Sequence, residues 1–440
     1  MAKISWPFIG ASRHFEIVGA DGAYLIASDG RRILDAAGGA IVSNVGHGRA
    51  SVAKAVAEAT QNETYVVPPW LTRSRRKLLE RLERDWLPPR FSHVHLTSGG
   101  SEAVETAMKI AIQYHAARGE SSRTQIIGRD ISYHGTTLAT TAVGGHEARK
   151  KGLAHVLPRY PKTATPYPLR CPLGPHHPDA GRYYADALEA TIASEGADTV
   201  AAFLAEPITG SSGGAIVPPD DYWPRVRRIC DAHGILLIAD EIMTGFGRTG
   251  LKFGHAHWPI EPDVFVAGKG LAGGYAPIAG VYATGPIADA IAEAGMNVMF
   301  HTFGAHPASC AAADEVLRIM TEEHLVERSA EVGERLQRRL VQAFSNHPHV
   351  AEVRGRGLLQ AIEIVADRGT LAPFPLEANV TDRVVGAALS RDVFFYPGGT
   401  GVVRDIVCLG PPFTIAEAEI DRMVEVLEAS VNDVMRRVAA

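Results

Sequence analysis

Short apolar runs bounded by turn residues alternate with helical patterns along the chain from about Phe91 onward. Each run has the length of a strand and is followed by a turn and a longer stretch with helical periodicity. Strands that alternate with helices form a mainly parallel sheet with helices on both faces. The sequence therefore predicts an α/β fold, with strands at residues 93–97, 125–128, 199–205, 235–239, 264–267 and 280–283.

The two ends of the chain follow a different pattern. Near the start, strand-like runs at 22–27 and 32–35 precede helical patterns at 50–61 and 73–86. After Pro307 the pattern is mostly helical, and it comprises helices at 308–320 and 325–344, a strand-like stretch at 352–364 and a last helix from 415 to about 438. Thr414 and Glu417 have the spacing of a capping box for that last helix.

A chain of 440 residues exceeds the usual size of one hydrophobic core. We expect a large α/β domain over residues 66–320 and a smaller α+β domain that combines residues 1–65 with residues 321–440. The stretch between Gly144 and Gly181 is rich in Pro, His and Tyr and has no clear period. A loop of this length in a compact domain is often functional.

The overall charge excludes some classes of partner. The chain has 44 Lys and Arg against 49 Asp and Glu, a formal charge of 44 − 49 = −5, so it offers no global attraction for nucleic acid or an anionic membrane. The densest basic cluster, at residues 73–77, leads into Leu78, Leu79 and Leu82. We interpret this cluster as the solvent-exposed face of an amphipathic helix.

Cysteine usage and the apolar runs indicate a cytoplasmic protein without a metal site. The four cysteines are scattered, lack metal-ligand spacing and indicate a reduced compartment: Cys171, Cys230, Cys310 and Cys408. The first ten residues contain no continuous apolar run of the kind found in signal peptides. The longest apolar runs are strand-length and far too short to span a membrane.

Two predicted strands are followed by residues whose side chains are candidates for catalysis. Asp240 follows the apolar run 234–239, and ligands of open α/β sheets bind beyond the carboxyl ends of strands. Lys269 stands between Gly268 and Gly270 after the strand at 264–267. A lysine at a dry strand end has a lowered pKa and is available as an amine nucleophile. Taken singly, Asp240 is equally typical of a turn cap, and Lys269 is more typical of an exposed loop lysine.

The glycines around Lys269 also match a dinucleotide-binding pattern, Gly268-x-Gly270-x-x-Gly273. That pattern has to open a helix, and Pro277 follows shortly afterwards instead. We therefore reject this interpretation.

Two further segments supply complementary groups. Residues 97–103, TSGGSEA, join a strand to a helix, and small residues there expose N–H groups that suit a phosphate. Tyr133 follows the strand at 125–128, where an aromatic ring can pack on a ligand or serve only the loop. An anion cradle, an aromatic platform, a carboxylate and an amine are together the four contacts that pyridoxal phosphate requires.

The chain resembles the class III aminotransferases, which are fold type I enzymes dependent on pyridoxal phosphate. The most specific block is LLIADEIMTGFGRTG at 236–250, followed by AGKGLAGGYAP at 267–277. The resemblance extends from Trp6-Pro7-Phe8 to Pro411-Pro412-Phe413, and the spacing 269 − 240 = 29 is the family's usual aspartate-to-lysine distance. It implies a mainly parallel sheet of the seven-stranded type.

The resemblance assigns the catalytic roles to two residues. Lys269 matches the lysine that forms a Schiff base with the cofactor and moves the proton between the substrate α-carbon and the cofactor. Asp240 matches the carboxylate that keeps the pyridine nitrogen protonated, and Ile242 matches the apolar residue beneath the ring.

Other positions match the residues that hold the cofactor. Gly100 and Ser101 match the phosphate cradle, and Tyr133 matches the stacking aromatic, with His134 beside it. Thr302 matches a threonine that reaches the phosphate bound by the neighbouring subunit. That match implies a homodimer, or a dimer of dimers, with shared active sites.

The substrate-binding residues match the family less closely. Glu206 matches the glutamate that pairs with a mobile arginine in relatives. Arg404 is the candidate for that arginine, although its register is unusual, and pairing with Asp405 at the surface is the alternative. Cys408 stands where ornithine-type relatives have an arginine.

Three apolar or aromatic residues lie where relatives place the amino-donor pocket: Tyr65, Trp70 and Ile41. For Ile41, ordinary core packing is the alternative.

The resemblance implies transfer of an amino group from an amine or ω-amino acid to an oxo acid, pyruvate or 2-oxoglutarate, by a ping-pong mechanism. An epimerase, an aminomutase or a decarboxylating transaminase of the same family is the alternative, although decarboxylases favour tryptophan where Tyr133 stands. A non-catalytic scaffold is a third interpretation. The presence of both Lys269 and Asp240 argues against it.

Overall fold

Seven strands form the central sheet of the structure, a computed structural model that describes residues 15–401 and 403–438. The Trp6-Pro7-Phe8 segment lies outside those residues. The strands follow the order β4-β10-β9-β8-β7-β5-β6, and only β10 runs antiparallel to its neighbours. Their bounds are His93–Thr97 (β4), Gln125–Arg129 (β5), Lys162–Thr163 (β6), Val200–Ala205 (β7), Leu236–Asp240 (β8), Val264–Ala267 (β9) and Ala279–Ala283 (β10). The predicted α/β fold with a mainly parallel, seven-stranded sheet is confirmed.

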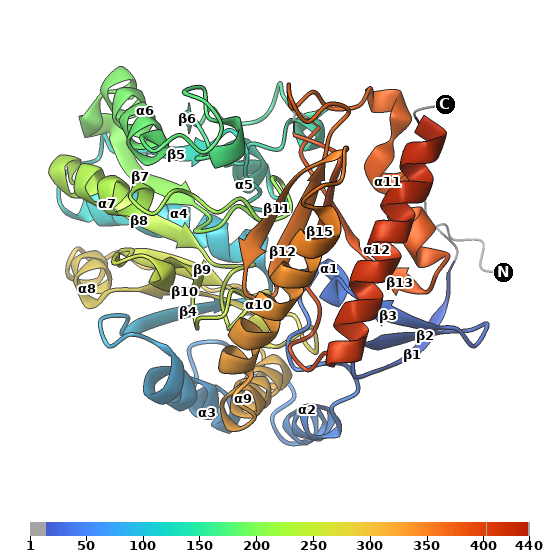
Figure 1. Ribbon diagram of the computed structural model, residues 1–440. Helices are drawn as coiled ribbons and strands as arrows, with labels where there is room; N and C mark the ends of the chain where they lie inside the picture. Colours follow the sequence, from blue (N-terminus) through green and yellow to red (C-terminus); the bar gives the residue numbers. More distant parts are fainter. Residues whose placement is uncertain (1–14, 402, 439–440) are drawn as a thin grey trace.

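Helices cover both faces of this sheet (Figure 1). Helices α4 (Gly100–Ala117) and α8 (Gly285–Glu293) pack on one face, while α6 (Ala180–Glu195) and α7 (Tyr222–His233) pack on the other. Successive residues of a strand point to opposite faces. Leu236 and Ile238 accordingly belong to the apolar cluster that contains α4, and Leu237 belongs to the cluster that contains α7. A sheet buried on both faces needs continuous apolar strands, which is the pattern seen in the sequence.

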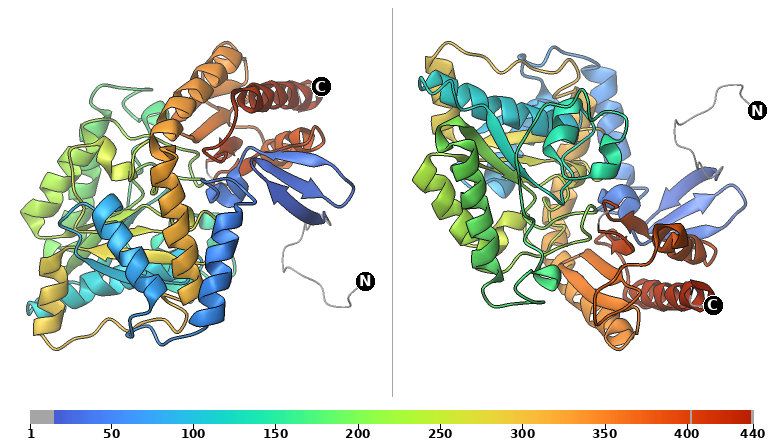
Figure 2. Two further views of the ribbon diagram at one scale, coloured as in Figure 1. Left: turned by 90° about the horizontal axis from the view of Figure 1, so that it is seen from below. Right: turned by 90° about the horizontal axis from the view of Figure 1, so that it is seen from above.

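Strands from the two ends of the chain share a second, four-stranded sheet (Figure 2). Its order is β1-β2-β3-β13, and β13 pairs parallel to β3. The bounds are Ile17–Asp21 (β1), Tyr24–Ala27 (β2), Arg32–Asp35 (β3) and Val393–Phe394 (β13). The union of the two ends is the arrangement on which the predicted domain division rests, and its boundaries at residues 65 and 320 stay a prediction.

A third sheet is antiparallel and has the order β11-β12-β15-β14. Its strands are Val350–Arg356 (β11), Leu359–Ile364 (β12), Tyr396–Gly398 (β14) and Ile406–Leu409 (β15). The remaining helices are Gly38–Ile41 (α1), Ala50–Asn62 (α2), Arg73–Arg81 (α3), Leu138–Val143 (α5), Pro307–Glu322 (α9), Leu325–Phe344 (α10), Val380–Leu389 (α11) and Glu417–Val438 (α12).

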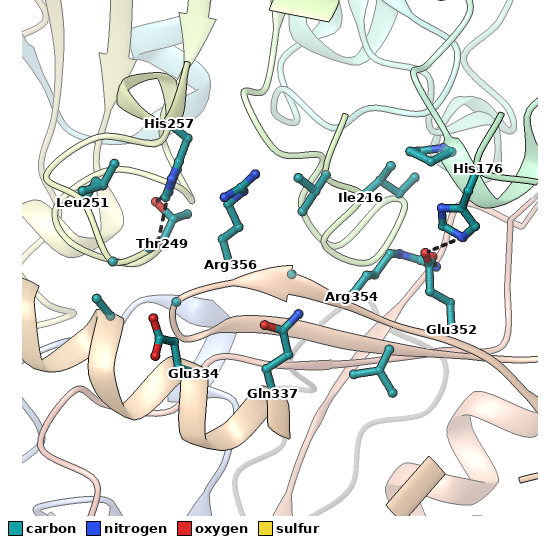
Figure 3. Close-up of a pocket in the computed structure, with 17 residues that line it drawn as sticks. His176, Ile216, Thr249, Leu251, His257, Glu334, Gln337, Glu352, Arg354 and Arg356 are labelled. Atoms are coloured by element: carbon teal, nitrogen blue, oxygen red, sulfur yellow. Dashed lines mark hydrogen bonds and ion pairs between the residues drawn. The ribbon is translucent and has the colours of Figure 1, made fainter. Parts of the chain in front are cut away.

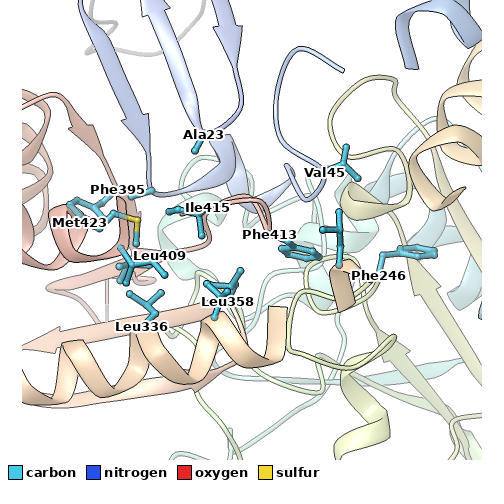
Figure 4. Packing of buried hydrophobic residues seen from close by; sticks show 14 of the residues in the cluster. Ala23, Val45, Phe246, Leu336, Leu358, Phe395, Leu409, Phe413, Ile415 and Met423 are labelled. Atoms are coloured by element: carbon cyan, nitrogen blue, oxygen red, sulfur yellow. The ribbon is translucent and has the colours of Figure 1, made fainter. Parts of the chain in front are cut away.

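One apolar cluster joins these parts (Figure 4). Ala23 of the N-terminal segment, Leu336 of α10 and Met423 of α12 belong to it together with Phe246, which follows β8. Burial of this shared core at about 25 cal/mol per Å² of apolar area stabilises the contact between the two ends and the central sheet.

The last helix begins later than the sequence pattern predicts. It starts at Glu417 rather than Ile415, and the N–H of Ala416 donates to Glu419 Oε2 at 2.7 Å. The predicted capping box of Thr414 and Glu417 is therefore wrong, because the bond between a glutamate and the N–H at the helix start joins Glu419 to Ala416, two residues further along.

The basic cluster at 73–77 also differs from its interpretation as a solvent-exposed helix face. Arg75 is only 3% exposed, whereas Arg73, Arg76 and Lys77 are exposed. Arg75 stands three and seven residues before Leu78 and Leu82, so helical spacing places it on the buried face. The interpretation of the whole cluster as exposed overlooked this spacing. Within residues 15–401 and 403–438, no helix is long and apolar enough to cross a membrane.

Candidate active site

The carboxyl ends of β5, β7, β8 and β9 meet the N-terminus of α4 at one edge of the central sheet. Parallel strands bring their following loops to the same edge, where ligands of such sheets bind. A cavity of about 290 Å³ lies there. The predicted residues that line it are Gly100, Ser101, Tyr133, His134, Glu206, Asp240, Ile242 and Lys269.

Lys269 begins a tight turn that directly follows β9. Its backbone is left-handed, with φ 42°, and its carbonyl accepts the N–H of Gly273 at 3.0 Å. Burial lowers the pKa of Lys269 to about 8, and the carboxylates of Asp240 and Glu206 oppose that change. The amine is therefore far easier to deprotonate than an ordinary lysine.

The glycine before Lys269 serves close packing. A Cβ on Gly268 would lie 2.9 Å from Ala279 Cβ and 3.2 Å from Ile242 Cδ1. Any larger residue would push the turn away from β10 and displace the lysine. This requirement explains the glycine that the sequence places there.

Asp240 is held by two hydrogen bonds at the end of β8. It is 3% exposed, its Oδ1 accepts the N–H of Ile242 at 3.0 Å, and its Oδ2 lies 2.7 Å from His134 Nδ1. Because the carboxylate accepts, Nδ1 of His134 carries the proton in this contact. The bond fixes both the orientation of the carboxylate and the ring of His134.

The start of α4 presents backbone N–H groups to the cavity. Ser98, Gly99, Gly100 and Ser101 all line it, and α4 extends over 18 residues. A Cβ on Gly100 would lie 3.2 Å from Ile242 Cγ2, so the small residue keeps this end open. The N–H of Ser98 donates to Glu102 Oε2 at 2.9 Å, so the first N–H groups of α4 itself and the helix dipole are what favour an anion at this place.

Glu206 follows β7 and is bound to the backbone. Its Oε1 accepts the N–H of Gly210 at 2.9 Å and its Oε2 accepts the N–H of Tyr133 at 3.4 Å. Burial raises the pKa of Glu206, while His134 and Arg129 oppose the change. Its contacts thus connect the loop of Tyr133 with the loop after β7.

Arg404 does not line the cavity. Its Nε and Nη2 donate to the carbonyl of Phe374 at 3.1 and 2.9 Å. Asp405, the alternative partner, accepts instead from the N–H of Phe374 at 3.2 Å. Arg404 thus binds the carbonyl of Phe374, and Asp405 binds its N–H. The role of Arg404 as a mobile arginine stays a prediction.

Other predicted residues also lie outside the cavity of this single chain. Trp70 is 68% exposed and Tyr65 is 44% exposed, and Thr302 is exposed as well. Ile41 is 1% exposed and packs in the core, and its neighbour Val42 lines the cavity.

Sequence patterns missed several residues around the cavity. Val42, Ser211 and Met243 line it. The guanidinium of Arg149 lies over the ring of Tyr133, 4.4 Å from its centroid. Arg149 belongs to the aperiodic stretch between Gly144 and Gly181. The unusual length of that stretch was the signal in the sequence that indicated a functional loop.

A larger cavity of about 580 Å³ lies between α10, β11 and the loop at 249–257 (Figure 3). Several of its charged residues are paired with one another, since Glu352 accepts from Arg354 at 2.8 Å and lies 3.4 Å from His176. Its lining contains none of the predicted site residues and no lysine. The smaller cavity is the candidate active site because it combines an amine, a buried carboxylate and a helix N-terminus, which the larger cavity does not.

The chain matches the family model "Aminotransferase class-III" over residues 10–431. It is 36% identical to an uncharacterised aminotransferase of Bacillus subtilis, covering 94% of each chain. It is 34% identical to the putrescine–pyruvate aminotransferase of Pseudomonas aeruginosa, covering 96% of this chain and 92% of the relative.

A solved structure agrees along the whole length. An amine transaminase from an uncultivated Pseudomonas species, in its PLP-bound form, superimposes with a TM-score of 0.91 at 35% identity, covering 100% of this chain and 99% of the other. This chain thus has the fold of the type I transaminases. It belongs to the class III aminotransferase family.

Proposed function

We propose that this protein transfers an amino group from an amine or ω-amino acid to an oxo acid, pyruvate or 2-oxoglutarate, in two successive half-reactions with bound pyridoxal phosphate. The observation that carries the proposal is one cavity that contains the amine of Lys269, the carboxylate of Asp240 and the glycine-lined start of α4. The named activity of the Pseudomonas aeruginosa relative supports an amine donor and pyruvate as acceptor.

The residues of the cavity fit this cofactor. Gly99, Gly100 and Ser101 offer N–H groups to a phosphate, and the Cβ that Gly100 lacks would meet Ile242 at 3.2 Å. Asp240 would accept a hydrogen bond from the protonated ring nitrogen, and Tyr133 would cover the ring. When bound, pyridoxal phosphate supplies an aldehyde and an electron-withdrawing ring.

The protein's own residues then control one proton. The amine of Lys269 is neutral above a pH of about 8. It would therefore be able to take the proton from the substrate α-carbon and deliver it to the cofactor. The carboxylate of Asp240 would lie beside the ring nitrogen and favour the protonated ring. His134 orients Asp240 through the 2.7 Å contact.

We also propose that the protein acts as a homodimer or a dimer of dimers. Large apolar side chains are exposed in two segments, 65–71 and 299–303, which we call the first and second exposed segments. They are Tyr65, Trp70, Leu71, Met299, Phe300 and Phe303. Exposed apolar groups gathered in this way mark association surfaces. Thr302 of the second exposed segment would reach the phosphate held by the partner subunit.

A cytoplasmic location is part of the same proposal. All four cysteines are free and buried, which agrees with a reducing compartment.

A panel of amines and ω-amino acids, each assayed with pyruvate and with 2-oxoglutarate, tests the activity. We expect one donor class to give product with initial rates that show parallel double-reciprocal lines. Borohydride treatment of the yellow protein should attach the cofactor to Lys269 in a peptide map, and Lys269→Ala should abolish turnover. Attachment at another lysine would refute the assignment.

A further inference from the structure

Arg75 lies in the first turn of α3 and is the buried member of the basic cluster at 73–77. The side chain of Thr72 caps this helix by accepting the N–H of Arg75 at 3.3 Å. Side chains of a helix tilt toward its N-terminus, so the guanidinium of Arg75 points back over the loop that precedes α3. It is 3% exposed there, whereas the neighbouring Arg76 is exposed.

The guanidinium donates to five main-chain carbonyls. The acceptors are those of Ala305 at 2.6 Å, Val67 at 2.9 Å and Pro68 at 3.4 Å, together with closer contacts to Val66 and Trp70. Four of these carbonyls belong to the loop before α3, and the fifth belongs to the residue two positions before α9. One side chain therefore connects two segments that are 305 − 70 = 235 residues apart.

Helix stability does not account for this arrangement. A positive charge near a helix N-terminus opposes the helix dipole, and burial of a guanidinium costs free energy unless its donors are satisfied. Burial also lowers the pKa of Arg75, which is the expected sign for a charge held by neutral acceptors. The contacts with the two loops are what keep the charge in place.

The two connected loops carry the residues of the exposed segments. Tyr65 and Phe303 touch edge to face across them, with ring centroids 6.1 Å apart. Ala305 has a left-handed backbone, with φ 55°, which a residue with a Cβ adopts only where its surroundings impose it. The hydrogen bond from Arg75 to the Ala305 carbonyl is one such constraint.

We propose that Arg75 is a positioning residue that sets the relative placement of the first and second exposed segments. Through them it places Trp70 and Tyr65 for the amino donor and Thr302 for the cofactor phosphate of the partner subunit. This inference rests on the proposed function, because those roles of Trp70, Tyr65 and Thr302 belong to it.

Three variants test the proposal. Arg75→Met removes all five hydrogen bonds, and Arg75→Lys keeps the charge but has only three donors and no planar fork. Arg76→Met is the matched control, since it removes the same type of side chain from the next, exposed position. Each is prepared as the full-length protein with and without pyridoxal phosphate.

Amide hydrogen exchange of the cofactor-free protein is the first measurement. We expect Arg75→Met to speed exchange at least about tenfold in peptides covering 64–71 and 299–306, a change of about 1.4 kcal/mol in local opening. Arg75→Lys should give a smaller increase and Arg76→Met none. Unchanged exchange in Arg75→Met and Arg75→Lys would overturn the proposal.

Kinetics with the cofactor added provide the second measurement. In Arg75→Met, and more weakly in Arg75→Lys, the Kd for pyridoxal phosphate and the KM for the amine donor should rise about tenfold. At saturating cofactor and donor, kcat should stay within about threefold, because Lys269 and Asp240 are untouched. A fall in kcat with unchanged Kd and KM would overturn the positioning role. An inactive wild-type protein would refute the proposed function instead, and the exchange result would still decide whether Arg75 connects the segments.

Discussion

Individual residues were predictable from the sequence where a motif fixed both their type and their position. The strand ends placed Lys269 and Asp240 at one edge, and the structure brings both into one cavity. Ile41 shows the limit of this reasoning, because a shift of one residue decides between core and cavity, and Val42 is the residue at the cavity. Arg75 shows another limit. No local pattern reveals that its guanidinium donates to four carbonyls of the preceding loop and to the carbonyl of Ala305.

The reactivity of Lys269 should follow its lowered pKa. In the cofactor-free protein, the amine is protonated below about pH 8 and becomes a nucleophile above it, in contrast to the ordinary value of 10.5. Competitive labelling with an amine reagent, read by mass spectrometry, should therefore show a midpoint near 8 for Lys269. Asp240→Asn should move the midpoint lower, because the Asp240 charge favours the protonated amine. A midpoint above 10 in the folded protein would contradict the burial that the structure shows.

Asp240→Asn should also affect catalysis much more than cofactor binding. A neutral amide does not hold the ring proton, so the charge that develops during proton removal loses its stabilisation. We expect single-turnover proton abstraction to fall at least about a hundredfold, in line with the loss of a strong electrostatic contact. The Kd for pyridoxal phosphate should change by less than about tenfold. Unchanged abstraction would show that Asp240 does not contact the ring nitrogen.

At the scale of elements, periodicity predicted most strands and helices but not their details. Strand β6 has only two residues, too few to produce a pattern, and the strand-like stretch at 352–364 is a hairpin of β11 and β12. The hairpin turns at Gly357, whose φ of 53° and close approach to the backbone of Thr249 require a glycine. Tertiary neighbours of this kind are absent from the local sequence, which is why the turn was not predicted.

Two aperiodic segments supply the candidates for binding the oxo-acid carboxylate. Arg404 precedes β15, and Arg149 lies over the ring of Tyr133. Arginine is suited to bidentate recognition of a carboxylate. Loss of the arginine that binds the oxo acid should therefore raise the KM for the oxo acid about tenfold or more and leave the KM for an uncharged amine donor unchanged.

Arg404→Ala and Arg149→Met, measured separately in each half-reaction, distinguish the two positions. The prediction made from the family register is that Arg404→Ala gives the selective effect. If only Arg149→Met does, the carboxylate site lies at the loop after Gly144. Equal losses in both half-reactions would indicate a structural role.

At the scale of the whole molecule, the sequence predicted that the two ends combine, and β3 and β13 do pair. That prediction came from the chain length and from the different patterns at the two ends, whereas the pairing of β3 with β13 itself was not predicted, since no local pattern connects residues so far apart. The first and second exposed segments also concern the whole molecule, because their large apolar side chains are exposed in a single chain.

Shared active sites predict complementation between two inactive subunits. Lys269→Ala lacks the amine in its own cavity, and a Thr302→Trp subunit should block the site of its partner. Mixed dimers contain one site with neither defect, so mixing after partial unfolding should restore up to about a quarter of the wild-type activity if association is random. Sedimentation should show a dimer or larger. No recovery in confirmed mixed dimers would contradict a role for Thr302 across the interface.

The parallel pairing of β3 with β13 also sets an order of events during synthesis. The ribosome must add 394 − 35 = 359 residues after Asp35 before Phe394 is available to complete the sheet. At about 5–20 residues per second, that interval is about 20–70 s. Throughout it the edge of β3 has unpaired backbone groups, which recruit other strands when left open. We therefore expect the β3 edge to stay open to pairing with other chains until nearly the whole protein has been made.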